Sequence, residues 1–246
     1  MRVFMLINTI TNVCKAVVIP LLLGFPIAVI AYRMELWPMG VSFKIIKYTG
    51  YASIAVLAVS ILIGLFTLFK KQYPLAKRCA FIAILSAIPA IGLSMQASKA
   101  KSLPFLHQVT TDTVNLPKFN AIIALRGDNS NPLAYDQEKL APLQLAAYPK
   151  LKPILSQLDK DQAFAKALEV ALSLGWEVVA KNEQQGIIEA VDTSALWAFK
   201  DDIAIRVQAL GVSSKIDLRS ISRIGGTDLG ANAARVEKFI TTFSDK

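Results

Sequence analysis

The sequence predicts a chain of two parts: an all-α anchor of three transmembrane helices over residues 1–98, and an α+β domain over residues 104–246. Three observations lead to this prediction. The 246-residue chain is unusually apolar, with 54% hydrophobic residues and a mean hydropathy of +0.45. Its charge is divided unevenly, because residues 1–100 carry ten basic residues and one acid, whereas residues 101–246 carry 17 of each. Only the second part shows the alternation of apolar and polar residues that is typical of strands.

Three uncharged apolar stretches define the membrane part: Ala16–Tyr32, Tyr48–Phe69 and Cys79–Ser98. A helix needs about 20 apolar residues to cross the hydrocarbon core of a bilayer, and each stretch is long enough once the flank of the first is included. One such stretch could be a core helix of a soluble protein. Three in succession, each bounded by lysine or arginine, favour membrane spans. We expect the helices at about 13–32, 48–69 and 79–98.

The loops between the spans predict the orientation. The loop Lys70–Arg78 carries four positive charges and no acid, and Arg2 and Lys15 precede the first span. Short basic loops remain in the cytoplasm. We therefore expect a multi-pass protein of the bacterial inner membrane, with a cytoplasmic amino terminus and a periplasmic domain after residue 100. The loop Arg33–Lys47 weakens this bias, because it also carries three positive charges, against Glu35.

The composition of the spans is that of an anchor. The three stretches contain no Asp, Glu, Lys, Arg or His, which are the residues that mark ion or substrate pathways. The lipid bilayer is therefore the expected partner, and a transporter is disfavoured. No small-x-small cleavage site follows the first stretch, so we expect it to be retained. Small residues predict close packing of the second and third spans; they are Gly64, Ala52, Ala55, Ala58, Ala83, Ala87 and Ala90.

A short linker, residues 99–103, leads into a domain of typical single-domain size. Near its start, Phe119–Leu125 is apolar and compatible with a strand or a helix. Further on, Ser156 or Asp159 can cap a helix over about Lys160–Leu174, and Gly175 is a suitable end for it.

The turn-like stretch 182–186 separates two predicted partner strands, at about 176–180 and 187–191, and alternation predicts two more at about 202–208 and 215–223. Thr227 or Asp228 can cap a last helix, whose apolar residues recur every three or four positions. The expected fold is therefore a mostly antiparallel sheet of about four strands, packed by two helices.

Charged side chains alternate along the last two predicted strands. Asp202, Arg206, Asp217, Arg219 and Arg223 can share one face of the sheet if these strands pair. Asp228 follows at the start of the last helix, where free backbone N–H groups favour anions. We consider two interpretations of this polar face: a salt-bridge ladder on a solvated surface, or a binding site for a small anion or an envelope component.

His107, the only histidine, lies five residues before Asp112. A histidine beside a carboxylate can perform acid–base chemistry, so these two residues are the catalytic candidates for a hydrolase. The competing interpretation is a structural histidine. One histidine and two cysteines exclude a metal site built on several such ligands, and we expect neither a metal nor a cofactor. A domain without net charge also argues against nucleic-acid binding.

Several stretches together resemble a known family. They include residues 107–113 (HQVTTDT), 175–177 (GWE), 199–207 (FKDDIAIRV), 217–225 (DLRSISRIG) and 228–235 (DLGANAAR). This combination, across most of residues 104–243, is similar to the bacterial and plastid domain-of-unknown-function family numbered 1499. The resemblance implies an exported or membrane-attached domain, and it implies no catalytic residues. Its characteristic motif adds Ser220, Asn232 and Arg235 to the residues of interest.

Taken together, these observations favour a membrane-anchored periplasmic domain that binds a ligand or another protein, rather than an enzyme. The expected ligand is a small anion or an envelope component held near Arg206, Arg219 and Arg223. Two alternatives remain open at this point. One is an envelope hydrolase that uses His107 with Asp112 or with the Asp202 and Asp217 carboxylates, and the other is a structural subunit of a membrane complex formed with other envelope proteins.

Overall fold

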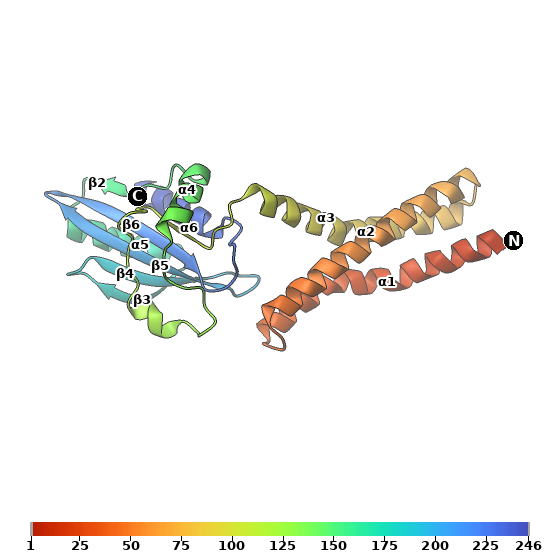
Figure 1. Cartoon of the computed structure of the whole chain (residues 1–246). Helices are drawn as coiled ribbons and strands as arrows, with labels where there is room; N and C mark the ends of the chain where they lie inside the picture. Colours follow the sequence, from red (N-terminus) through yellow and green to blue (C-terminus); the bar gives the residue numbers. More distant parts are fainter. Residues whose placement is uncertain (1, 246) are drawn as a thin grey trace. The chain divides into compact units, whose positions relative to one another are not determined.

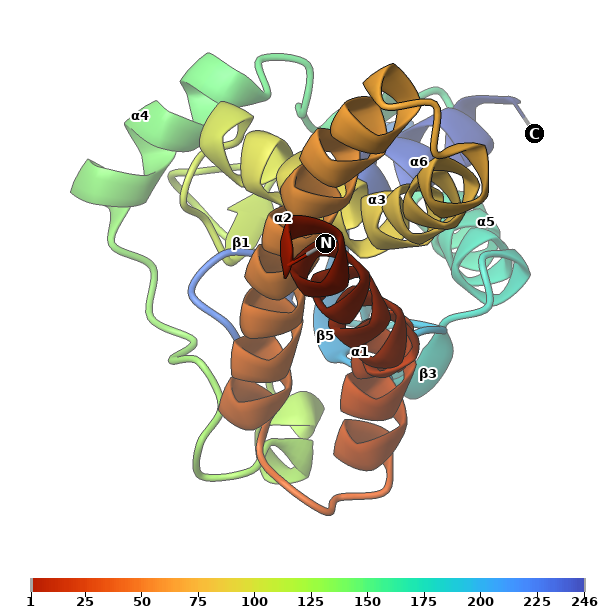
Figure 2. The same cartoon turned by 90° about the vertical axis from the view of Figure 1, so that its right-hand side faces the viewer.

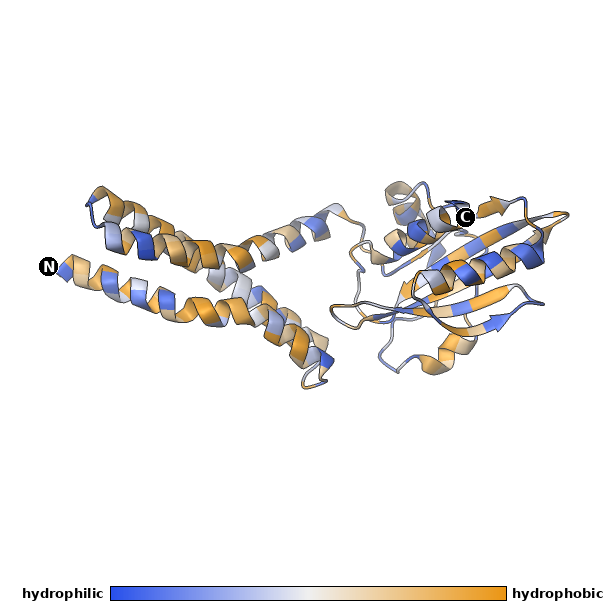
Figure 3. Ribbon diagram, turned by 180° about the vertical axis from the view of Figure 1, so that it is seen from behind, coloured by the Kyte–Doolittle hydropathy of each residue, from blue (hydrophilic) through white to orange (hydrophobic). Residues whose placement is uncertain are grey.

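The computed structural model describes residues 2–245 and divides the chain into two compact units, Met1–Lys99 and Ala100–Lys246. The first unit consists of three helices, α1 (Arg2–Arg33), α2 (Met39–Phe69) and α3 (Tyr73–Ser102). All three are long and apolar enough to cross a membrane, and Figure 3 shows hydrophobic residues along each of them. The helices extend beyond the predicted spans because the polar flanks continue the same helical turns. Pro20, Pro26 and Pro89 lie inside the helices.

Close contacts between the helices involve glycines and hydroxyl side chains more than the predicted alanines. A Cβ atom at Gly24 would lie 2.4 Å from the Thr49 hydroxyl, and one at Gly50 would lie 2.5 Å from Leu93. Of the predicted small residues, Ala90 is buried and Gly64 is half-buried against Cys79, whereas Ala52, Ala55 and Ala58 are exposed. Helices without a hydrophobic driving force between them pack where their backbones can approach closely, which glycine permits.

The second unit contains one antiparallel sheet with helices packed against it (Figure 1). The sheet has six strands, in the order β1-β6-β5-β4-β3, and β2 also pairs with β6. All pairs are antiparallel. The bounds are β1 Gln108–Thr110, β2 Ile154–Ser156, β3 Glu177–Asn182, β4 Ile187–Thr193, β5 Lys200–Leu210 and β6 Ser213–Ser222.

The predicted fold class is confirmed, but the sheet is larger than the expected four strands. The two additional strands, β1 and β2, have three residues each, which is too short for an alternating pattern to be recognised. Both depend on β6 as their partner. Long-range pairing rather than local sequence therefore forms them.

Two of the three helices of the domain agree with the prediction from local signals. Asp159 accepts a hydrogen bond from the Gln162 N–H and caps α5 (Lys160–Ser173), and Gly175 adopts a φ of +80° just after it. Asp228 accepts from the Asn232 N–H ahead of α6 (Ala231–Asp245). The third helix, α4 (Gln137–Ala147), was not predicted, and Phe119–Leu125 contributes a short 3₁₀ helix, η1, over Ala121–Leu125.

One face of the sheet, the helix face, is covered by α5 and α6, which lie side by side (Figure 2). Its core consists of apolar residues from both layers. On the α6 side, Trp176 stacks on Phe239 with ring centroids 5.6 Å apart. Ile203, Ile205 and Leu218 point into this core from β5 and β6 and are fully buried.

The opposite face, the loop face, is covered by the segment that runs from Asp112 to Tyr135. Phe119 and Ile122 from this segment pack against Val191, Ala204 and Ile221 of the sheet. The interpretation of this face as a solvated surface is therefore wrong. The charged residues predicted to lie there are largely enclosed by protein, and their electrostatic interactions are correspondingly stronger than at an open surface.

Candidate functional site: the loop face of the sheet

The strand register brings the predicted charged residues together on the loop face. Arg206 lies opposite Asp217, Ala204 opposite Arg219, and Asp202 opposite Ile221. Asp202 and Asp217 are completely buried, and Arg219 is 6% exposed. A buried charge is costly unless it is paired and hydrogen-bonded, so the partners of each residue decide what the face can do.

The first group of partners surrounds Asp217. The Arg206 guanidinium donates to Asp217 Oδ2 at 2.8 Å and to the Asn115 carbonyl at 2.7 Å. The Lys215 ammonium lies 3.4 Å from Asp217 and donates to Asp112 at 2.9 Å. Two carboxylates, of Asp112 and Asp217, thus face two cations, Arg206 and Lys215. The Arg206 guanidinium forms an ion pair within the domain.

Asp112 belongs to this group rather than to a catalytic pair. Burial acts to raise the pKa of Asp112, but hydrogen bonds from the Asn115 N–H, Lys215 and the Val114 N–H outweigh it, so the pKa is lowered. Asp112 therefore serves as an anionic anchor for the loop that begins there.

A second group surrounds Asp202. Arg223 lies 2.8 Å from Asp202 Oδ1, and Arg126 donates to Asp202 Oδ2. Arg126 also donates to the Asn131 carbonyl, and Arg223 to the Leu125 carbonyl at 2.7 Å. Sequence reasoning missed Arg126, because this residue lies in a stretch with the composition of a turn. Its contact with Asp202 of β5 joins residues that are 76 positions apart in the sequence.

Arg219 differs from its neighbours because no carboxylate pairs with it among the described residues. Its guanidinium donates to Gln108 Oε1 at 2.7 Å and to the Leu133 carbonyl, and it lies 5.1 Å from the centroid of the Phe119 ring. Its Nε atom is buried and has no hydrogen-bond partner. Burial, assisted by Arg126 and opposed by Tyr135, lowers the pKa of Arg219 to about 10.

Two further buried atoms near Arg219 also lack partners: the Tyr135 hydroxyl and His107 Nε2. Burial raises the pKa of Tyr135, and the nearby Arg219 guanidinium acts in the opposite direction. Tyr135 was not among the predicted residues. Its position next to Ala134, whose carbonyl accepts from Gln108 Nε2, places it in the same part of the loop face.

His107 is half-buried at the start of β1. Burial lowers its pKa, Asp228 acts to raise it, and Arg126 and Arg219 act to lower it further. Within residues 2–245, no hydrogen bond joins His107 to Asp112. These two residues are instead separated by the length of β1, and Asp112 pairs with Lys215. The carboxylate that influences His107 is Asp228, which caps α6 and does not lie on the loop face.

Glu189 is a further buried acid that sequence reasoning missed. Its carboxylate accepts hydrogen bonds of 3.0–3.1 Å from the backbone N–H groups of Asn120, Ala121 and Ile122, at the start of η1. Oriented N–H groups of this kind stabilise a negative charge. The signal available in the sequence was one acid within the apolar strand Ile187–Val191. Glu189 holds the covering segment on the sheet.

The remaining motif residues form a separate network on the helix face. Arg235 of α6 donates to Asp201 at 2.6 Å and to Asp192 at 2.7 Å. It also donates to Asn232 Oδ1, which accepts from the Ser220 hydroxyl at 2.6 Å. Asn232 Nδ2 donates to the Ser222 hydroxyl and to the His107 carbonyl. This network joins α6 to β4, β5, β6 and the start of β1.

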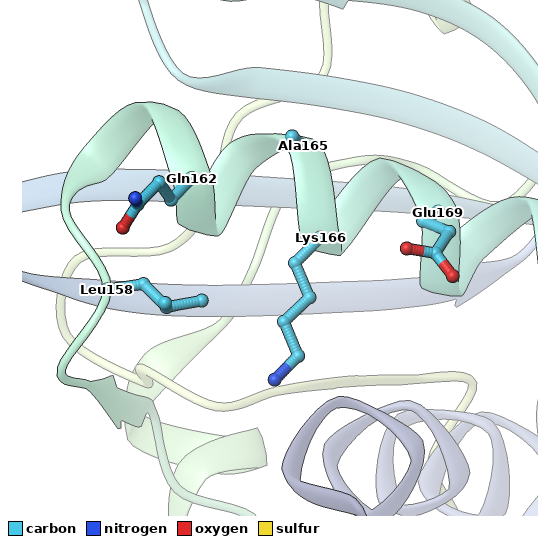
Figure 4. A pocket seen from close by; sticks show the side chains of 5 residues that line it. All are labelled: Leu158, Gln162, Ala165, Lys166 and Glu169. Carbon is cyan, nitrogen blue, oxygen red and sulfur yellow. The ribbon is translucent and has the colours of Figure 1, made fainter. Parts of the chain in front are cut away.

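One hollow in the domain lies away from both networks. It is open to solvent and lies along α5, where Leu158, Gln162, Ala165, Lys166 and Glu169 line it (Figure 4). The Lys166 ammonium lies 4.7 Å from the ring centroid of Phe243 on α6, which links the two helices. None of the predicted site residues lines this hollow. Within residues 2–245, no group of three or more His, Cys, Asp and Glu residues could hold a metal ion.

The family model described as a protein of unknown function (DUF1499) matches residues 108–243. No curated protein is similar to the chain. The matched range contains both polar networks and all six strands, and it agrees with the resemblance identified from the motif residues. Because the match covers more than half of the chain, the protein belongs to the DUF1499 family, with three apolar helices preceding the family domain.

Proposed function

We propose that the protein is a membrane-anchored binding protein whose DUF1499 domain holds a small anion at Arg219 on the loop face, and that it acts in binding rather than catalysis. The single observation that carries the proposal is a buried guanidinium without a carboxylate partner. An isolated buried charge is costly. An anion beside Arg219 would neutralise the charge and satisfy Nε.

The neighbouring arginines explain why Arg219 is the relevant residue. Arg206 is neutralised by Asp217, and Arg223 and Arg126 share Asp202. Each of these three arginines is therefore already engaged with a carboxylate. The proposed site is therefore narrower than the three-arginine site expected from the sequence, and it is centred on Arg219, which has no carboxylate partner among the described residues.

The free donors suggest the size of the ligand. Arg219 Nε and the Tyr135 hydroxyl are both buried and unpartnered, which suits one small oxyanion such as phosphate, sulfate or a carboxylate. The segment from Arg126 to Tyr135 covers Arg219 through the Leu133 carbonyl. Entry of the anion would therefore require this segment to move, and Tyr135 would move with it.

Thermal unfolding of the full chain in mild detergent tests the proposal, with sodium phosphate, sulfate and acetate as probes. At least one of these anions should raise the midpoint, because a ligand that binds only the folded state stabilises it. Arg219→Gln should abolish the rise. Lys166→Gln, which removes a cation from α5, should leave it unchanged, and Tyr135→Phe should reduce it without changing the charge.

Two outcomes would contradict the proposal. One is that no probe raises the midpoint, and the other is that Arg219→Gln retains the full rise. In the first case, co-purification of other envelope proteins in mild detergent would favour the structural-subunit alternative. The hydrolase alternative gains no support from the geometry, because Asp112, Asp202 and Asp217 form ion pairs with lysine or arginine and none of them is hydrogen-bonded to His107 among the described residues.

We also propose that the domain lies on the periplasmic side of a bacterial inner membrane. The support is the four positive charges in Lys70–Arg78, between the second and third spans. Alkaline phosphatase fused after Lys246 should be active, and green fluorescent protein at the same position should be dark. The reverse pattern would place the domain in the cytoplasm without affecting the anion proposal.

A further inference from the structure

Several segments that are distant in the sequence meet at one end of the sheet, where the chain enters the domain. The His107 carbonyl accepts from the Ser222 N–H at 2.9 Å, and the Lys200 carbonyl accepts from the Arg223 N–H at 3.1 Å. Ser194–Phe199 closes the turn between β4 and β5 at this same end. We call this end, with residues 103–107, 121–126, 194–200 and 223–230, the tether end.

Exposed apolar side chains occur on three of these segments. Phe105, Ile123, Leu125 and Leu196 are each more than half exposed. Contacts place two of them: the Phe105 ring packs on Gly226, and Arg223 donates to the Leu125 carbonyl. Leu196 lies in the turn between β4 and β5, and Ile123 lies in η1, two residues before Leu125. Apolar residues scattered singly over a surface need no explanation. Here four of them stand at one end of a sheet, on loops that do not follow one another in the chain.

The sequence next to these residues suggests what covers them. Only residues 99–103 separate the third apolar stretch from the domain, and they include Lys99 and Lys101. A chain of five residues spans at most about 18 Å, so the tether end must remain close to the lipid surface. Exposed Lys200 adds a third cation. Within the four segments the acid is Asp228, which is half-buried and accepts a hydrogen bond from the Asn232 N–H, and exposed Asp128 lies two residues beyond the second segment.

We propose that the tether end is a membrane-contact surface, in which Phe105, Ile123, Leu125 and Leu196 enter the headgroup region of the bilayer. Apolar side chains flanked by lysines are the composition that binds an anionic lipid interface. Such a contact would restrict the rotation of the domain about its linker. The proposal concerns a lipid surface and is independent of the anion at Arg219.

Lipid quenching of a site-specific label tests this contact in the full chain. Leu196→Cys and, as the matched control, Val212→Cys would each be labelled with a polarity-sensitive fluorophore. The native Cys14 and Cys79 are buried in the helical unit and should not react with a polar thiol reagent. Val212 is 90% exposed and lies in the turn between β5 and β6, at the opposite end of the sheet, about 30 Å away along the strands.

The labelled proteins would be reconstituted in vesicles of phosphatidylcholine and phosphatidylglycerol that carry nitroxide lipids. We expect the label at residue 196 to be quenched several-fold more by the nitroxide lipid than the label at residue 212, and less by aqueous iodide. Equal lipid quenching at the two positions, or iodide quenching that is as strong at 196 as at 212, would overturn the proposal. Both substitutions are at exposed sites, so neither should affect folding.

Discussion

The two faces of the sheet bury polar side chains in different ways. On the helix face, Arg235, Asn232 and Ser220 form a network in which each polar side-chain atom has a partner. On the loop face, by contrast, Arg219 Nε and the Tyr135 hydroxyl have none. A fully satisfied buried network stabilises a fold, whereas an incomplete one is costly unless another group completes it. The difference assigns a structural role to the helix face and makes the loop face the candidate for ligand binding.

The contrast originates in a single strand. In β6, Asp217, Arg219 and Ile221 point to the loop face, while Leu218 and Ser220 point to the helix face. Alternation along a strand sends neighbours to opposite sides. The motif DLRSISR is therefore two interleaved sets of residues, and its halves can be perturbed separately.

The largest expected effect comes from the helix face. Arg235→Met would leave Asp201 buried without its cation and would disconnect α6 from β5. Removal of one partner from a buried ion pair costs about 3–5 kcal/mol. Thermal unfolding of the full chain in detergent, followed by near-ultraviolet circular dichroism, should show a large fall in the midpoint. A midpoint close to that of the unmodified protein would show that this network is not structural.

A smaller effect is expected from the loop face. Arg219→Met leaves no carboxylate without its partner, and the groups that lose hydrogen bonds are Gln108 Oε1 and the Leu133 carbonyl. Loss of these hydrogen bonds lowers the free energy of unfolding by about 1–3 kcal/mol. Removal of a buried cation that has no carboxylate partner offsets part of this loss. The same unfolding measurement, made without added anions, should therefore rank Arg219→Met well above Arg235→Met in stability. The reverse order would remove the distinction between the faces.

The smallest expected effect concerns pH. The pKa of His107 is lowered in the folded state from its ordinary 6.5, so the folded protein binds fewer protons there than the unfolded chain. Stability from this residue is present above the unfolded pKa and is lost as the pH falls through the folded pKa. The unfolding midpoint should fall on acidification below about pH 6.5, and less so in His107→Gln. An equal fall in both proteins would assign the effect to other groups.

The elements predicted from the sequence were those with strong local signals. β5 and β6 alternate clearly, β3 and β4 flank a turn-like stretch, α5 has Asp159 as a cap and Gly175 as a stop, and the three apolar stretches are long enough to span a membrane. By contrast, β1 and β2 are too short to show such a pattern, and α4, although Asp136 caps it, contains Pro142 in its interior. The Gln144 side chain of α4 exchanges two hydrogen bonds with the Thr110 backbone, at 3.0 and 2.7 Å. That contact joins residues 34 apart, and no local pattern predicts it.

For the candidate site, the sequence by itself determined which charged residues share a face, because the period of a strand is two and the register of β5 with β6 follows from their hairpin. Only the tertiary structure decided that the segment from Asp112 to Tyr135 covers this face, that Arg126 supplies a second cation to Asp202, and that Arg219 is left without an acid. The physical reason is that pairing in a buried cluster depends on which loop folds over it. Loop placement results from many weak long-range contacts rather than from any one stretch of sequence.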